Sequence, residues 1–405
     1  MFNLNRDASK MNKNFLKLVV LCIGMQDMAV AAAMPAIAPM IEAFPNVSPP
    51  TIQTILTLPN LLVVIFSPMY AWLCTIVKVR KIILFAMTCF IVGGVFPVFL
   101  EHHLLLIAIS RVFVGIGAGL LIPGAIALIT VYYEGQERDT MIGWHMSISN
   151  IAGIFMQLLG GYLAVIHWKY CFFAYIFPIW ALTLAALKLP DPPQVFRSEL
   201  AENEKQGFLF ARLNKHTYGV IVLYFLITVL VVALPTNISV MLVNDGIGNP
   251  GNAGVTLSMF TVGAFFAGLI FGKIKKLAKG YILALGWLIL GIGYTMISLS
   301  YNLPGVYGAT LFAGFGLGIM VPGYYAKVSE VAPPLHISLG VAMNSAAQGM
   351  ANFLQPAIFA VILSIFNQPI GRFSMYISCI CLIIGAVTIA IVQSILGHRP
   401  NRAHN

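Results

Sequence analysis

Residues 115–124 read Gly-Ile-Gly-Ala-Gly-Leu-Leu-Ile-Pro-Gly, and residues 314–323 read Gly-Phe-Gly-Leu-Gly-Ile-Met-Val-Pro-Gly. The alternate glycines and the closing Pro-Gly pair recur at a constant offset, Gly314 standing 199 positions after Gly115. Two more pairs repeat at nearly this distance: Pro35 with Pro235, and Gln157 with Gln355. Similar offsets over segments far apart in the chain predict two copies of one unit with the same topology.

The composition places both copies in a membrane. Of 405 residues, 59% are apolar and only 9% are charged, whereas a soluble domain has roughly 25% charged residues. A soluble fold of this size could not hide so much apolar side chain from water. The same numbers exclude a disordered chain. The six cysteines are spread through long apolar runs, which excludes a secreted disulfide scaffold.

Twelve apolar runs are long enough to cross a bilayer. We place them at 15–41, 51–76, 82–100, 104–132, 140–166, 170–189, 217–243, 253–272, 280–300, 305–326, 337–365 and 371–396. The predicted fold is therefore an all-α integral membrane protein, with twelve transmembrane helices in two pseudo-symmetric six-helix bundles. Residues 1–189 form the N-terminal bundle, 190–216 a cytoplasmic linker, and 217–405 the C-terminal bundle.

The basic residues predict the orientation. An even number of spans puts both termini on one side. If that side is the cytoplasm, 20 of the 23 lysines and arginines lie in inner loops or tails, only Lys169 and Arg372 lie outside, and Arg111 lies within a span. This asymmetry predicts a multi-pass protein of the cell membrane with both termini cytoplasmic. Because the basic residues sit in separate short loops, the net charge of +10 does not indicate a nucleic-acid partner.

Three segments carry a resemblance to a known family. Residues 110–119, Ser-Arg-Val-Phe-Val-Gly-Ile-Gly-Ala-Gly, resemble the fourth-helix arginine–glycine motif of the proton-coupled antiporters of the major facilitator superfamily. Residues 168–173, Trp-Lys-Tyr-Cys-Phe-Phe, are similar to that superfamily's Trp-Arg/Lys-x-x-Phe segment, and residues 34–37, Met-Pro-Ala-Ile, to the end of the first helix in drug:proton antiporters. The resemblance implies the major facilitator fold, with two bundles that alternate access to a central cavity.

The chain departs from the family pattern at two positions. The loop between spans two and three has Thr75 where the family has an aspartate. In the fifth span, residues 157–159 read Gln-Leu-Leu before Gly160-Gly161, where the antiporters have Gly-Pro. Both departures count against drug efflux as the function more than they count against the major facilitator fold.

Asp27 and Arg111 are the deepest charged residues of the predicted spans. A charge at the bilayer centre costs on the order of 3 kcal/mol, so such residues face a cavity or each other. Counted along their helices at ~1.5 Å per residue, both lie at a similar depth. In the resembled fold, helices one and four both line the cavity. We therefore expect Asp27 to carry the proton and to interact with Arg111. A purely structural ion pair, or an Arg111 bound to backbone carbonyls away from Asp27, are the alternatives.

Neutral polar residues predict the rest of the cavity. Asn344, Gln348, Asn352 and Gln355 follow one face of the eleventh span. Asn150 and Gln157 share a face of the fifth span, and Asn237 lies beside Pro235 in the seventh. Amides facing lipid are costly, so these side chains point into the protein, either toward substrate or into hydrogen bonds between helices. His145, behind Trp144, is expected at the membrane interface rather than in a proton relay.

These features predict a proton-coupled secondary transporter that exports lipophilic or amphipathic organic compounds. The substrate-binding candidates are Arg111, Asn150, Gln157, Asn237, Asn344, Gln348 and Gln355, and the proton-coupling pair is Asp27 and Arg111. One alternative is uptake or exchange of a small organic anion whose carboxylate Arg111 binds, and another is a sensor that does not transport. The sequence has no Gly-x-x-x-x-Gly-Lys-Ser/Thr loop. We expect no enzyme activity, cofactor or metal, and partners limited to a small-molecule substrate, protons and lipid, with a monomeric chain.

Overall fold

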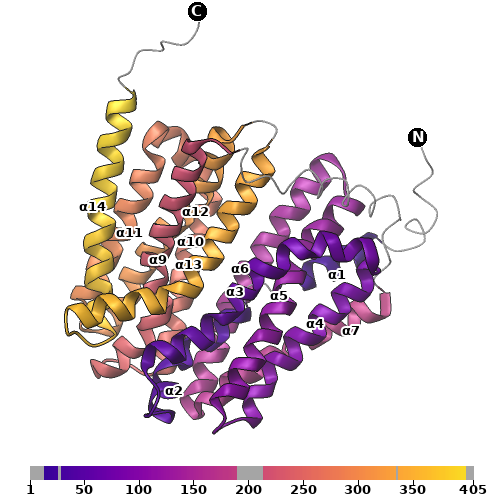
Figure 1. Ribbon diagram of the computed structural model, residues 1–405, viewed down its shortest axis with the longest axis horizontal. Coiled ribbons are helices and arrows are strands. Elements are labelled where there is room, and N and C mark those ends of the chain that lie inside the picture. The colour runs from indigo at the N-terminus through magenta and orange to yellow at the C-terminus, as the bar shows by residue number, and fades with distance from the viewer. Residues whose placement is uncertain (1–12, 26–28, 189–212, 334–335, 398–405) are drawn as a thin grey trace, which may run out of the picture. The chain divides into compact units, whose positions relative to one another are not determined.

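The computed structural model describes residues 13–25, 29–188, 213–333 and 336–397, and helices make up its regular structure in these ranges (Figure 1). Eleven of the helices formed by these residues are long and apolar enough to cross a membrane. Every predicted span from the second to the twelfth overlaps one of them. The predicted all-α membrane fold is therefore confirmed.

In the N-terminal half, the spans from the second to the sixth are continuous or nearly so. They are α3 (Pro49–Ile76), α4 (Val79–Val95) with η3 (Phe96–Phe99), α5 (Leu104–Tyr132), α6 (Gly135–Ile166), and η4 (Trp168–Ile176) with α7 (Ile179–Lys188). The sixth span changes from 3-10 to α-helix around Pro178, because proline has no N–H and disfavours α-helix at the residue before it.

The first predicted span, 15–41, is a series of shorter helices. The described pieces are α1 (Lys13–Gly24), the 3-10 helix η2 (Ala29–Ala36) and α2 (Ile37–Ala43). Pro35 lies inside η2 and cannot donate a backbone hydrogen bond. Residues 26–28, and with them Asp27, lie outside the described residues.

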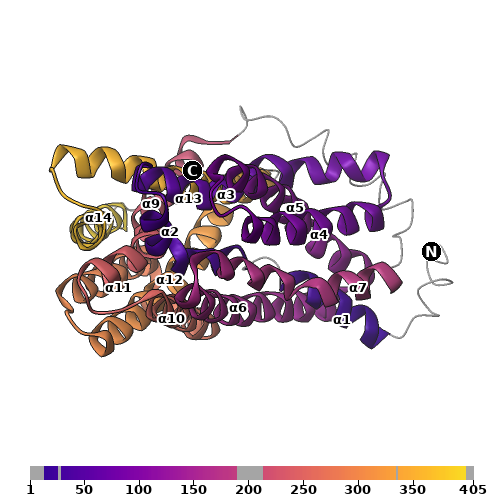
Figure 2. The same ribbon diagram turned by 90° about the horizontal axis from the view of Figure 1, so that it is seen from below.

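In the C-terminal half, six long helices follow one another. They are α9 (Lys215–Asn244), α10 (Pro250–Ala278), α11 (Ile282–Leu299), α12 (Leu303–Val331), α13 (Ile337–Ile365) and α14 (Arg372–Gly397). Helix α12 packs along both α10 and α11, as the two views show (Figures 1 and 2). Helix α13 packs along α9.

The repeated glycines have the same role in both halves. Helix α5 and helix α12 begin and end 199 residues apart. A Cβ on Gly115 would overlap α3, and a Cβ on its counterpart Gly314 would overlap the α10 backbone at Phe260. Two residues on, a Cβ on Gly117 would strike α4, and one on Gly316 would strike α11. In each half, the absent side chains let one helix pack against two neighbours at backbone distance.

The contacts divide the chain into two compact units. One comprises residues 1–47 and 51–212, and the other comprises residues 48–50 and 213–405. Most of the predicted linker, 190–216, lies outside the described residues. The two units are described separately below.

Candidate functional site

Arg111 lies in the interior of the N-terminal unit. It is on α5, and only 1% of its surface is exposed. A buried guanidinium must find hydrogen-bond acceptors, because an unpaired charge in an apolar medium is costly. Its partners therefore define the site.

The first partners are two carbonyls at the end of α4. Nη2 of Arg111 donates to the Gly93 oxygen at 2.9 Å and to the Gly94 oxygen at 3.1 Å. The residue four positions after Gly93 is Pro97, which has no N–H, so this carbonyl lacks its helical donor. Because the last carbonyls of a helix carry partial negative charge, Arg111 acts as a cationic cap for α4.

Aromatic rings from η4 enclose the other side of the guanidinium. Its carbon lies 4.7 Å from the ring centre of Phe172 and 5.1 Å from that of Tyr175. Cations bind favourably to such ring faces, the more so when both groups are removed from water. A Cβ on Gly94 would overlap the Tyr175 ring, so the glycine admits the ring as well as offering its carbonyl.

The Tyr175 hydroxyl connects Arg111 to the first span. Nη1 of Arg111 donates to this hydroxyl at 3.2 Å, and the hydroxyl donates to the Val30 oxygen of η2 at 3.2 Å. Val30 is three residues after Asp27 in the sequence. The hydrogen-bond chain therefore joins α4, α5, η4 and η2.

One nitrogen of Arg111 is not accounted for by these bonds. Within the described part of the chain, the buried Nε of Arg111 has no hydrogen-bond partner. The predicted partner, Asp27, lies outside the described residues, so the Asp27–Arg111 pair stays a prediction. Arg111 does bind backbone carbonyls, those of Gly93 and Gly94, as one of the alternatives to the pair supposed.

Helix α6 packs against the chain on both sides of positions 26–28. The Ser149 hydroxyl donates to the Gly24 oxygen at 2.7 Å, and a Cβ on Gly24 would overlap the His145 ring. Farther along α6, a Cβ on Gly160 would overlap the Ala32 carbonyl. His145, Ser149 and Gly160 therefore mark the face of α6 that covers the first span.

The two predicted amides of α6 differ in their surroundings. Gln157 is buried, with 8% of its surface exposed. Asn150 is half-buried, and its Nδ2 donates to the Met146 oxygen of its own helix at 2.9 Å. Asn150 therefore has a local partner for one of its amide hydrogens.

In the C-terminal unit, two of the predicted residues meet through a threonine. The Thr236 hydroxyl of α9 lies 2.9 Å from Oε1 of Gln355 on α13 and 2.8 Å from the Val232 oxygen of its own helix, and its single proton is shared between these acceptors. Nδ2 of Asn237 donates to that hydroxyl at 2.9 Å and to the Ala233 oxygen at 2.9 Å. This network links α9 to α13 and corresponds to the helix–helix interpretation of these residues.

Nearer the start of α13, two other residues of its predicted polar face have different neighbours. The Tyr325 hydroxyl donates to Oε1 of Gln348 at 3.3 Å. Asn344 is completely buried, and within the described residues neither atom of its amide has a hydrogen-bond partner. Such an amide is expected to bind water or another polar group that enters the unit.

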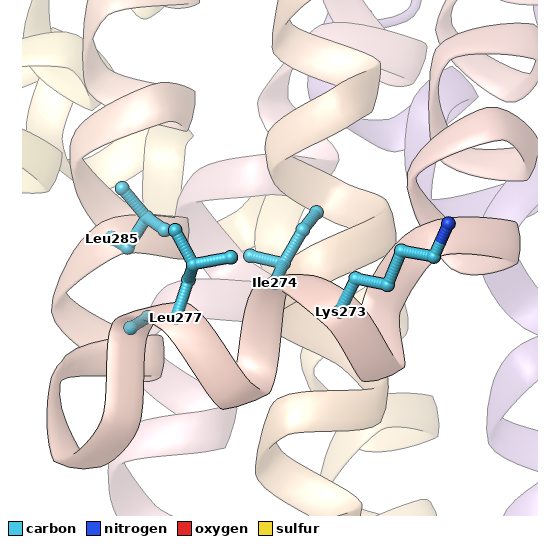
Figure 3. A pocket seen from close by; sticks show the side chains of 5 residues that line it. Lys273, Ile274, Leu277 and Leu285 are labelled. Atoms are coloured by element: carbon cyan, nitrogen blue, oxygen red, sulfur yellow. The ribbon is translucent and has the colours of Figure 1, made fainter.

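A surface pocket at the end of α10 includes neither the contacts of Arg111 nor the polar residues of α9 and α13. It has a volume of about 400 Å³ and is lined by Lys273, Ile274, Leu277, Ala278 and Leu285 (Figure 3). Figure 3 shows the side chains of Leu285, Leu277 and Ile274 close to one another, with the side chain of Lys273 extending away from them. An open apolar surface of this kind is ordinary on a helix that contacts lipid.

Gly93, Gly94 and Tyr175 were not among the predicted site residues. The signal for Gly93 is the proline four residues later, which leaves a helical carbonyl without a donor. Tyr175 carries no comparable signal, because its contact depends on how η4 is rotated against α5.

The family description of the Major Facilitator Superfamily matches residues 19–356. The chain belongs to the Major Facilitator Superfamily. It is a multi-pass membrane transporter and not an enzyme, as the sequence predicted.

Two curated relatives and one solved structure are similar over much of the chain. The Bacillibactin exporter of Bacillus subtilis (strain 168) is 22% identical over 370 residues, covering 87% of this chain and 91% of that protein. Multidrug resistance protein 1 of the same strain is 27% identical over 296 residues, covering 70% and 72%. An inward-facing, unoccupied bacterial homolog of the human lysosomal transporter Spinster has a TM-score of 0.74 at 16% identity, covering 97% and 100%.

Proposed function

We propose that this transporter couples proton movement to the export of lipophilic or amphipathic organic compounds. Asp27 binds and releases the proton, and Arg111 responds to its charge. When Asp27 is ionised, the Nε–H of Arg111, which has no partner among the described residues, offers it a charge-assisted hydrogen bond. Protonation removes that attraction and changes the relative stability of the two cavity orientations.

The observation that carries this proposal is the hydrogen-bond chain from Arg111 through Tyr175 to Val30. It attaches the buried cation to the chain three residues from Asp27. Two carbonyls and two rings fix the guanidinium from the other sides. A change of charge at Asp27 would therefore act on α4, α5 and η4 together.

The same contacts argue against Arg111 as the binding site for a substrate carboxylate. Bidentate recognition of a carboxylate needs two free N–H groups of one guanidinium edge. In Arg111 both Nη atoms already donate within the protein, and the side chain is 1% exposed. An organic anion would have to displace these bonds, so we favour the export of compounds without an essential carboxylate.

Two observations support the proposed direction of transport and the substrate class. Both curated relatives are named for export or resistance. Two predicted amides of the C-terminal unit outside the α9–α13 network, Asn344 and Gln348, are uncharged and suit substrates that are held by hydrogen bonds and apolar contact. We further propose that the protein works as a monomer in the cell membrane with both termini cytoplasmic.

Proteoliposomes test the proposal. The purified chain is reconstituted, a pH gradient is imposed, and the flux of ethidium, a lipophilic cation, is followed by fluorescence. We expect a gradient-driven flux that nigericin, which dissipates the gradient, abolishes. Protein-free liposomes give the background rate.

Two further probes separate the alternatives. Radiolabelled benzoate driven by the same gradient, with no ethidium flux, would favour the organic-anion carrier. No gradient-driven flux of ethidium, benzoate or a panel of neutral and cationic dyes would contradict the proposal and favour a sensor.

A further inference from the structure

The surface pocket at the end of α10 combines apolar side chains with a positive charge. Ile274, Leu277 and Leu285 lie close to one another, and the side chain of Lys273 extends away from them (Figure 3). Leu277 is 85% exposed, so the described part of the chain leaves this apolar surface largely uncovered. The shape suits a ligand that has an apolar part in the pocket and an anionic part beside it.

The length of α10 places this pocket at the edge of the membrane. The predicted span 253–272 is about 30 Å long at about 1.5 Å per residue, which matches the hydrocarbon core of a bilayer. Helix α10 continues to Ala278, so its last turns extend beyond that core into the layer of the lipid headgroups. Tyr281, which follows in η6 (Lys279–Tyr281), is 46% exposed and fits this depth, because tyrosine is enriched at membrane interfaces.

The lysines at the end of α10 differ in their partners. Lys275 pairs with Glu330 of α12 at 3.0 Å, and Lys327 pairs with the same carboxylate at 3.4 Å. The side chains of Lys273 and Lys276 are exposed, and within the described residues neither has an ion pair or a hydrogen bond. Residues three apart are neighbours on a helix surface, so these two ammonium groups can bind one anion together. This side of α10 therefore presents positive charge that the protein itself does not neutralise.

We propose that this pocket binds an anionic phospholipid of the cytoplasmic leaflet. The phosphate of the lipid binds the ammonium groups of Lys273 and Lys276. One of its acyl chains covers the apolar side chains of Ile274, Leu277 and Leu285. The proposed orientation places this end of α10 on the cytoplasmic side, where anionic lipids give the membrane surface a negative potential. The inference depends neither on proton coupling nor on the identity of the exported compound.

Native mass spectrometry of the purified full chain in detergent tests the site, with phosphatidylglycerol as the anionic probe and zwitterionic phosphatidylcholine as the comparison. We expect the wild type to bind its first phosphatidylglycerol molecule more tightly than phosphatidylcholine. Lys273→Gln should weaken the binding of phosphatidylglycerol about fivefold, which is the contribution of one lysine near the headgroups. Lys275→Gln is the matched control, because it removes the same charge from the same helix at a lysine that Glu330 already neutralises. Its binding should stay unchanged.

Ala278→Phe is the second variant, because it keeps every charge and fills the apolar pocket. We expect it to weaken the binding of phosphatidylglycerol as well. Glycerol 3-phosphate, which carries the phosphate without acyl chains, should not displace the lipid from the wild type.

Four results would overturn the proposal. The first is equal affinity of the wild type for the two lipids, and the second is wild-type affinity for phosphatidylglycerol in either Lys273→Gln or Ala278→Phe. The third is an equal loss in Lys273→Gln and Lys275→Gln, which would indicate a general attraction to a basic surface. The fourth is displacement of the lipid by glycerol 3-phosphate, which would indicate a site for a soluble phosphate ester.

Discussion

Arg111 of α5 donates to the Gly93 carbonyl of α4 at 2.9 Å, at the position where Pro97 leaves that carbonyl without its helical donor. A proline in one helix thus creates the acceptor for a cation on the next. The guanidinium holds the end of α4 and, through Tyr175, the chain that follows Asp27.

Arg111→Lys is expected to destabilise the N-terminal unit by about 1–3 kcal/mol. Lysine keeps the charge but cannot reach two carbonyls and the Tyr175 hydroxyl with one nitrogen, so buried acceptors lose their donors. Thermal unfolding in detergent measures the change. Lys81→Gln, at an exposed position of α4, is the control and should change stability by less than about 0.5 kcal/mol. An unchanged melting temperature in Arg111→Lys would refute the capping role.

Gly94→Ala is expected to destabilise the protein by about 1–3 kcal/mol, because the new methyl group overlaps the Tyr175 ring. Gly219→Ala on α9 is a matched control, since a Cβ there meets nothing within 4 Å. That change should be neutral, or stabilising by up to about 1 kcal/mol. The contact would be disproved if both alanine variants melted alike.

Thr236→Val removes the hydroxyl that joins α9 to α13 through Gln355. Interhelical hydrogen bonds of this kind are worth about 0.6 kcal/mol on average and up to about 1.7 kcal/mol. We expect a loss of stability in that range. Thr228→Val serves as control, because its hydroxyl bonds the Tyr224 carbonyl of its own helix at 2.7 Å. Equal effects of the two valines would argue against the interhelical bond.

The contacts of Glu101, which lies outside the spans, predict that the stability of the protein depends on pH. Its carboxylate pairs with Lys169 and, at 2.9 Å, with Nε2 of His167. The hydrogen bond from Lys169 is the main cause that lowers the pKa of Glu101 below its ordinary value of 4.5. A lowered pKa in the folded state stabilises the protein above pH 4.5, and this contribution is lost as the pH falls through the folded-state pKa.

Glu101→Gln should therefore lower the melting temperature at pH 7, and its difference from wild type should shrink below pH 4.5. Thermal unfolding of both proteins between pH 3.5 and pH 7.5 measures the difference. A difference that stays constant over this range would show that the carboxylate charge contributes nothing.

The sequence predicted the spans closely and the helix contacts poorly. The predicted limits 104–132 and 337–365 coincide with α5 and α13, because long apolar runs have little choice of structure in lipid. The fifth span was predicted to begin at residue 140, but α6 begins at Gly135, because the polar segment before it continues the helix. Residues 135–139 were predicted to be a loop because they are polar, but polarity alone does not end a helix.

The site could be predicted only in part. Arg111 could be identified as a buried charge from the sequence, because a charged side chain within a span is costly in lipid whichever way its helix is turned. Its acceptors Gly93, Gly94 and Tyr175 depend on how α4, α5 and η4 are turned against one another. His145 was placed at the interface from its position in the span, but the absence of a side chain at Gly24 lets α1 cover it.

Asp27→Asn gives the most direct test of the coupling scheme. The variant and the wild type are reconstituted side by side, and ethidium flux is measured with and without an imposed pH gradient. We predict that Asp27→Asn loses the response to the gradient, because asparagine cannot change its charge, while it retains ethidium movement down its own concentration gradient. Gradient-driven flux at the wild-type rate in Asp27→Asn would contradict the account.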